Sequence, residues 1–165
     1  MLDLVRLAVK FWALLGGLLL IGVIVTTALS VVLGLTLGQP IAGDFEITEM
    51  GVAIAAFAFL PYSQITYANV TVDLFTSWAS PRLQAAMALL SSSIAVAFSL
   101  LLLWRMWAGM ADYRQHDEYT AIIGIPLWTA FPPILLSLLL LAFAALVTAA
   151  ENLQGVLARP AGKTR

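Results

Sequence analysis

Four long runs of apolar residues dominate the pattern of this chain, and short polar stretches separate them. The runs cover residues 11–37, 50–67, 83–107 and 127–149. About 20 apolar residues are enough to cross the hydrocarbon core of a bilayer as a helix. Because backbone polar groups in a bilayer must bond within their own segment, such runs are expected to be helical. The pattern therefore predicts an all-α integral membrane protein with four transmembrane helices, forming a single membrane domain over residues 1–165.

The first run also allows an interpretation as a cleavable secretory signal. Arg6 and Lys10 precede it, and Ala28-Leu29-Ser30 resembles a cleavage site. However, the apolar run continues beyond that site, whereas the core of a signal peptide normally has only about 7–15 residues. We therefore expect the segment to be retained as the first membrane helix.

Small residues recur at every fourth position of the same run, namely Thr26, Ser30, Gly34 and Gly38. Residues at this spacing share one face of a helix, and small side chains allow a second membrane helix to approach closely. The alternative is that such residues are simply common in membrane helices. We expect this face to pack against another helix.

The composition agrees with a membrane environment and narrows the possible chemistry. Hydrophobic residues make up 62% of the 165 residues and charged residues only 10%, whereas about 25% is usual in soluble domains. A net charge of −1 provides no basic surface, so nucleic acid is not an expected partner. With no cysteine and one histidine, His116, the chain offers no disulfide and no thiolate metal site. We expect no catalytic, cofactor or metal site in this chain.

The distribution of basic residues predicts the orientation of the helices. Arg6 and Lys10 precede the first run, Arg82 lies between the second and third, and a basic tail follows the fourth. The loop of residues 38–48 has no lysine or arginine, and that of residues 109–125 has a single arginine. By the positive-inside rule, both termini and the middle loop are cytoplasmic.

The second run combines an acidic start with polar residues near its end. Glu46 and Glu49 lie one turn apart at its outer end, where carboxylates also suit the positive end of a helix dipole. Pro61 is expected to kink the helix because proline lacks a backbone donor. Gln64 follows the proline and is expected to contact either another protein helix or the cytoplasmic headgroups.

Residues 70–79 have the pattern of a short amphipathic helix between the second and third spans. Val70, Leu74 and Trp78 share its apolar side, and Asp73 lies on the polar side. Such a segment is expected to lie flat in the membrane interface.

Arg105 is the one basic residue within the third apolar run. Its position between Trp104 and Trp107 places it at the outer aromatic belt, where a long side chain can extend to the headgroups. Consecutive membrane helices run in opposite directions, so Arg105 could instead pair with Glu46 or Glu49, the deeper Glu49 being preferred. The two interpretations remain open.

Several short motifs, taken in order, resemble the small membrane subunit of TRAP (tripartite ATP-independent periplasmic) transporters, the DctQ-like family. They are Phe45-Glu46 with Glu49, then Val72-Asp73-Leu74, then Asp117-Glu118-Tyr119-Thr120 leading into Gly124-Ile125-Pro126-Leu127-Trp128. The resemblance covers nearly the whole chain, including four spans of similar length. The family usually has a histidine shortly before the aspartate, where this chain has Asn69.

The resemblance implies a small permease subunit that acts as a membrane scaffold or stator for the large permease subunit. It implies sodium-coupled uptake of an organic acid that a periplasmic binding protein delivers, with sodium bound at the large subunit and no cofactor in this chain. The implied location is the bacterial inner membrane, in contact with lipid. The candidate residues for structure or a partner interface are Glu46, Glu49, Pro61, Gln64, Asp73, Trp78, Arg105 and Trp128.

Other functional classes fit the sequence less well. A haem-bearing membrane anchor normally needs two axial ligands within its spans, and a proton-coupled exporter needs an acid buried in a span, whereas Glu49 lies near an end. An intramembrane enzyme would need a nucleophile with a base. The remaining alternative is an unrelated four-helix scaffold or assembly subunit of another complex.

Overall fold

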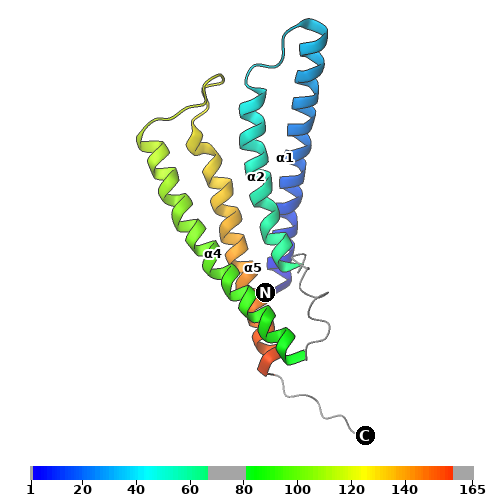
Figure 1. Cartoon of the computed structure of the whole chain (residues 1–165), viewed down its shortest axis with the longest axis vertical. Helices are drawn as coiled ribbons and strands as arrows, with labels where there is room; N and C mark the ends of the chain where they lie inside the picture. Colours follow the sequence, from blue (N-terminus) through cyan, green and yellow to red (C-terminus); the bar gives the residue numbers. More distant parts are fainter. Residues whose placement is uncertain (1, 67–80, 158–165) are drawn as a thin grey trace.

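The computed structural model describes residues 2–66 and 81–157, and these residues are helical apart from the connecting loops (Figure 1). In chain order the helices are α1 (Leu2–Leu37), α2 (Asp44–Ile65), α4 (Pro81–Gln115), the 3₁₀ helix η1 (Leu127–Ala130) and α5 (Phe131–Leu157). The helices α1, α2, α4 and α5 are each long and apolar enough to cross a membrane. The prediction of an all-helical chain with four spans is therefore confirmed for the described residues.

Two of the sequence predictions stay open. The amphipathic helix expected at residues 70–79, with Asp73 and Trp78, lies outside the described residues. The cytoplasmic location of the termini depends on a membrane and remains a prediction.

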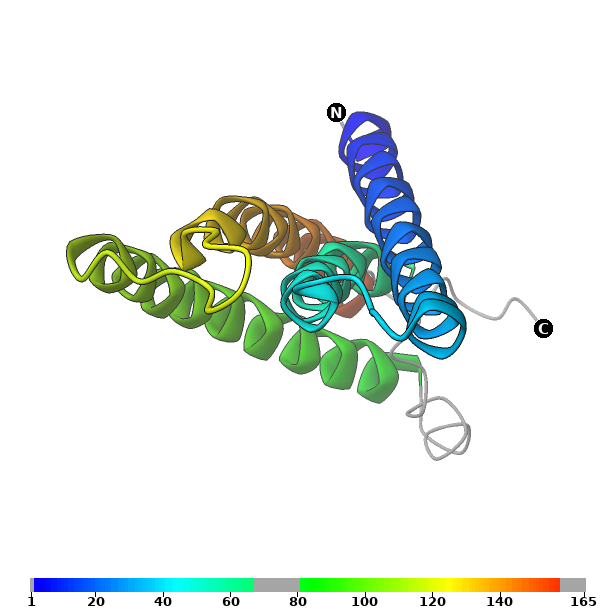
Figure 2. The same cartoon turned by 90° about the horizontal axis from the view of Figure 1, so that it is seen from above.

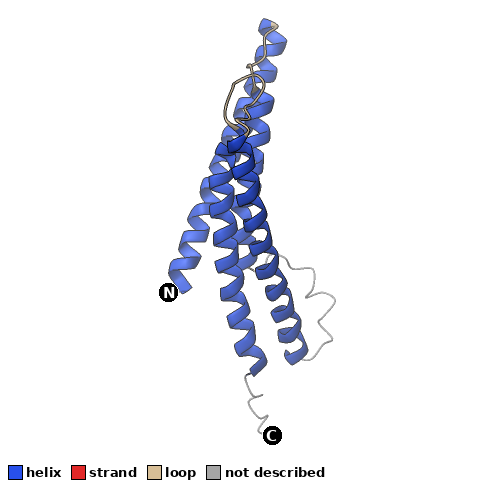
Figure 3. Cartoon of the chain, turned by 90° about the vertical axis from the view of Figure 1, so that its left-hand side faces the viewer, coloured by secondary structure: helices blue, strands red, loops and turns tan. Residues whose placement is uncertain are grey.

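The helices form a row in the order α1, α2, α5 and α4 (Figures 1 and 2). The chain therefore inserts its last helix between its second and its third, and α2 and α5 become the central pair. Figure 3 shows the row from its side, with the described loops at its upper end. The centre of the core lies on α5, where Leu138, Ala144 and Ala145 are fully buried. Both outer helices leave wide apolar faces exposed, as expected for contact with lipid or another membrane protein.

The helices extend beyond the apolar runs that predicted them. The helix α4 continues to Gln115, eight residues past the predicted span, so Asp112 and Arg114 lie on its last turns rather than in a loop. Hydropathy indicates how far the apolar side chains extend, whereas a helix continues until its backbone hydrogen bonding is interrupted. Here the break follows at Asp117, which has a left-handed φ of 48°.

Close contact between α1 and α2 depends on two glycines. A Cβ atom added at Gly16 would lie 2.7 Å from the Cβ of Ala58, and one added at Gly51 would lie 2.4 Å from Cγ2 of Val23. Neither distance is compatible with normal packing. Small residues therefore allow these two backbones to approach, which is how helices associate in lipid without a hydrophobic driving force.

The small-residue face predicted for α1 is confirmed only at Ser30, which is fully buried. Thr26 donates to the carbonyl of Gly22 in its own helix, and Gly38 has a φ of 71° just after the end of α1. Three residues of α1 that contact α2 are seven apart, namely Gly16, Val23 and Ser30. Each residue of a helix turns by about 100°, so residues seven apart differ in direction by only about 20°, whereas residues four apart differ by about 40°. A row of residues four apart therefore turns away from the neighbouring helix sooner than a row of residues seven apart.

Each contact between neighbouring helices of the row also contains a polar side-chain hydrogen bond, and a further bond joins α1 to α5. The pairs are Thr27–Thr48 at 2.9 Å, Trp12–Ser137 at 2.8 Å, Gln64–Thr148 at 3.1 Å and Asn152–Ser92 at 3.0 Å. A bond of this kind in a membrane protein contributes about 0.6 kcal/mol on average. Together with the glycine contacts, these bonds fix the order and register of the row.

We predict that alanine at Gly16 or Gly51 destabilises the folded chain by about 1–3 kcal/mol, because the added methyl group must push α1 and α2 apart. Gly22→Ala is the matched control. Gly22 lies on α1, as Gly16 does, but a Cβ atom added there would have no heavy atom within 4 Å. Thermal unfolding in detergent, followed by circular dichroism, measures the difference. Equal melting temperatures for all three variants would contradict this packing.

Candidate functional site

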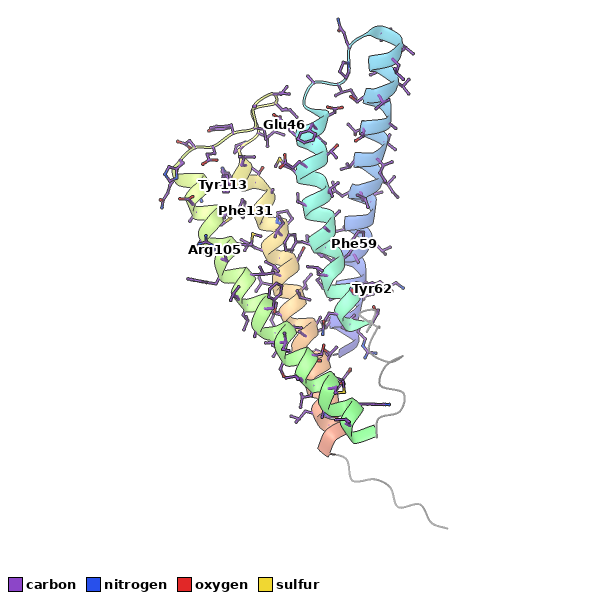
Figure 4. The ribbon with its side chains drawn as sticks, in the orientation of Figure 1. Glu46, Phe59, Tyr62, Arg105, Tyr113 and Phe131 are labelled. Atoms are coloured by element: carbon purple, nitrogen blue, oxygen red, sulfur yellow. The ribbon has the colours of Figure 1, made fainter. Side chains whose placement is uncertain are left out.

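The candidate site lies where the α4–η1 loop crosses the first turn of α2. The carboxylate of Glu46 accepts two backbone hydrogen bonds from the tip of that loop. The N–H of Ile122 donates to Oε1 at 2.7 Å, and the N–H of Ile123 donates to Oε2 at 3.0 Å. Figure 4 shows Glu46 at the head of α2, on the side of this loop. We call this contact the Glu46 clasp.

The loop presents these two amides because its own backbone is folded into a narrow turn. The N–H of Thr120 donates to the carbonyl of Ile125 at 2.9 Å, and the N–H of Ile125 donates to Oγ1 of Thr120 at 3.0 Å. Gly124 has a φ of 71°, a conformation that other residues rarely adopt. The amides of Ile122 and Ile123 at the tip of this turn bond to the carboxylate of Glu46, which satisfies both backbone donors.

Gly43 allows the loop to reach the start of α2. This residue caps the helix with a φ of 73°, and an added Cβ would lie only 2.1 Å from Cγ1 of Ile123. The position therefore needs glycine for its backbone conformation and for space. The side chain of Ile123 occupies the volume that a Cβ would fill.

The preceding loop is fastened to α1 in a similar way. The buried hydroxyl of Ser30 donates to Oδ2 of Asp44 at 2.5 Å and accepts a bond from the N–H of Ile41 at 3.0 Å. The other carboxylate oxygen of Asp44 accepts the N–H of Phe45 at 2.7 Å. The first turn of α2 is thus held by α1 through Asp44 and by the α4–η1 loop through Glu46.

Aromatic contacts hold the C-terminal end of α4 against η1 and the start of α5. The ring of Tyr113 lies 5.4 Å from that of Phe131, centroid to centroid (Figure 4). The guanidinium carbon of Arg114 lies 5.6 Å from the centroid of Trp128 in η1, within the range of a cation–π interaction. Trp128, predicted as an interface candidate, therefore contacts Arg114 of its own chain.

His116 is exposed and follows the C-terminal end of α4. Its pKa is raised, first because Nδ1 donates to the carbonyl of Asp112 at 2.9 Å and second because the carboxylate of Asp112 lies 3.4 Å away. Both interactions favour the protonated ring.

The proposed pairing of Arg105 with the glutamates is wrong for this structure. Glu46 bonds to the loop, and Arg105 and Glu49 are both exposed, with no hydrogen bond or ion pair between them. The pairing assumed that helices consecutive in the sequence are neighbours in space. Instead α5 separates α4 from most of α2, and Arg105 lies on α4 at the edge of the row (Figure 4).

Two other predicted residues have partners inside the chain. Pro61 is fully buried within α2, which continues to Ile65. Gln64 donates a hydrogen bond to Thr148 of α5. Of its two predicted environments, another protein helix or the headgroups, the structure therefore shows the first. Sequence reasoning did not find the amides of Ile122 and Ile123, because backbone donors have no side-chain signature.

We predict that Glu46→Gln opens the clasp, because a neutral amide provides one acceptor where the carboxylate provides two. Amide hydrogen exchange at Ile122 and Ile123 should become roughly tenfold faster. Glu49→Gln is the matched control, since it removes the same charge one turn away and should leave both rates unchanged. Unaltered exchange in Glu46→Gln, or equal acceleration in both variants, would contradict the clasp.

Comparison with known proteins agrees with this architecture. Residues 23–155 match the family described as "Tripartite ATP-independent periplasmic transporters, DctQ component". No curated protein and no solved structure matches the chain. The matched segment runs from the middle of α1 through the clasp to the last turns of α5. The chain belongs to the DctQ family of TRAP transporter components.

Proposed function

We propose that this chain is the small permease subunit of a TRAP transporter and serves as a membrane scaffold for the large permease subunit. In this proposal the large subunit carries the sodium and substrate sites, and a periplasmic binding protein delivers an organic acid to the complex. Membership of the DctQ family supports the subunit assignment.

The observation that carries the scaffold role is the use of the buried polar groups. The fully or nearly fully buried polar side chains of the described residues are Ser30, Ser92, Ser99, Ser137 and Thr148. Each donates a hydrogen bond to an acceptor of this chain. A path for an ion or a solute needs polar groups that exchange partners during transport, whereas these groups connect helices or satisfy their own backbone. The interior therefore suits a rigid support.

The proposed orientation places the Glu46 clasp on the periplasmic side. Arg6, near the other end of the row, forms an ion pair with Glu151 at 3.1 Å. Most of the other basic residues of the chain also adjoin the ends of the spans on the side of Arg6. By the positive-inside rule, this favours a cytoplasmic location for the end of the row that contains Arg6 and Glu151. The clasp then belongs to the surface that faces the binding protein, in the inner membrane of a bacterium.

The test is reconstitution of this chain with the large permease subunit and the binding protein of the same transporter. Uptake of a radiolabelled organic acid into proteoliposomes should require all three proteins and a sodium gradient. Leaving out this chain should reduce uptake to the rate of empty vesicles. Full uptake without it would contradict the subunit role, and saturable binding of the acid to this chain alone would contradict the scaffold role.

A further inference from the structure

We infer that the chain is built from two helical hairpins, α1–α2 and α4–α5, which bind each other through one interface and do not need the covalent link between them. Each hairpin consists of two consecutive long helices and the loop that joins them (Figure 1). The hairpin interface is formed by α5 and the α4–η1 loop on one side, and by α2 and the N-terminal part of α1 on the other. This division is independent of the proposed function, because it follows from contacts inside the chain.

The order of the helices in the row divides the described residues at a single place. The helix α1 packs along α2, and α4 packs along α5, whereas α4 has little direct contact with α1 or α2. A bundle with one common core would also bring its outer helices together, but a row keeps them apart (Figure 2). Separating α2 from α5 would therefore leave the internal contacts of both hairpins intact.

Each hairpin has packing contacts of its own. Within α1–α2, Gly16 and Gly51 allow the two backbones to approach closely. Within α4–α5, Asn152 donates a hydrogen bond to Ser92 at 3.0 Å, and aromatic contacts join the other end. Close packing and hydrogen bonds are the interactions that associate helices in lipid. Each hairpin therefore has the means to pack before it meets the other.

The hydroxyl groups of α5 at the hairpin interface are suited to both the separate and the joined state. Ser137 and Thr148 each donate to a carbonyl one turn earlier in α5 itself. Their oxygens also accept bonds from the other hairpin, from Trp12 at 2.8 Å and from Gln64 at 3.1 Å. A hydroxyl can donate and accept at the same time. Neither hydroxyl hydrogen is therefore unpaired before the hairpins meet, and two bonds are gained when they do.

Charged side chains lie at both ends of the hairpin interface. At the loop end, Glu46 accepts the amides of Ile122 and Ile123. Near the opposite end, Arg6 pairs with Glu151 at 3.1 Å. A slip of one hairpin by a helical turn, about 5.4 Å, would break both contacts at once. The two ends thus specify the register in which the hairpins join.

The order of the helices along the chain has a consequence for assembly. The helix α4 precedes α5 in the sequence, yet α5 is the helix on which α4 packs. The α1–α2 hairpin can therefore form first, and its side of the hairpin interface has no partner in the chain until α5 is inserted. Insertion of α5 then completes both the second hairpin and the interface.

Cleavage of the connection in the folded, full-length chain tests this inference. A flexible glycine–serine linker of about 20 residues, with a protease site at its centre, is inserted after Thr66. Because the entropy cost of a longer loop rises only slowly with its length, the uncut chain should melt within a few degrees of the wild type. After complete cleavage in detergent, an affinity tag at the C-terminus should recover both halves in equal amounts. Separation of the halves, or failure of the uncut chain to fold, would overturn the inference.

A matched pair of substitutions in the cut chain tests the hairpin interface itself. Gln64 and Asn152 both donate an amide N–H to a hydroxyl, at 3.1 and 3.0 Å, but only Gln64 does so across the interface. Gln64→Ala should raise the dissociation constant of the halves about threefold, the usual effect of one such bond in a membrane protein. Asn152→Ala should leave this constant unchanged. Equal effects of the two substitutions, or no effect of Gln64→Ala, would overturn the assigned interface.

Discussion

The architecture depends on one constraint, which is that a membrane interior offers no water to polar groups and no hydrophobic gain for bringing helices together. Helices can then be joined only by close packing and by hydrogen bonds between themselves. Gly16 and Gly51 provide the close packing of α1 and α2, and side-chain pairs such as Trp12–Ser137 connect more distant helices.

The Glu46 clasp connects the helices at the loop end of the row. It joins α2 to a loop that lies 76 residues later in the sequence, while Ser30 and Asp44 join α2 to α1. The two ends of the row are thus connected through the first turn of a single helix. Such a connection would suit the proposed scaffold role, because a displacement of one helix end would have to break several bonds at once.

Much of the fold could be predicted from the sequence, and the reasons differ from element to element. Hydropathy identified the four spans because burial in lipid requires long apolar runs. It did not place the end of α4 at Gln115, because helical bonding continues past the apolar surface. The pairing of Arg105 with Glu49 was wrong because the spatial order of the helices is set by packing, which has no simple pattern in the sequence. Glu46 was recognised as unusual, but its partners are backbone amides, which every residue except proline possesses.

The central claim is that this chain is a rigid support, and a distance measurement within the working complex tests it most directly. The chain has no native cysteine, so spin labels at Leu37 and Ala121 would report the separation of the α1–α2 loop from the α4–η1 loop. Double electron–electron resonance should give one narrow distance distribution that does not change when sodium, the binding protein and the transported acid are added. A shift or a second population under transport conditions would contradict the scaffold account.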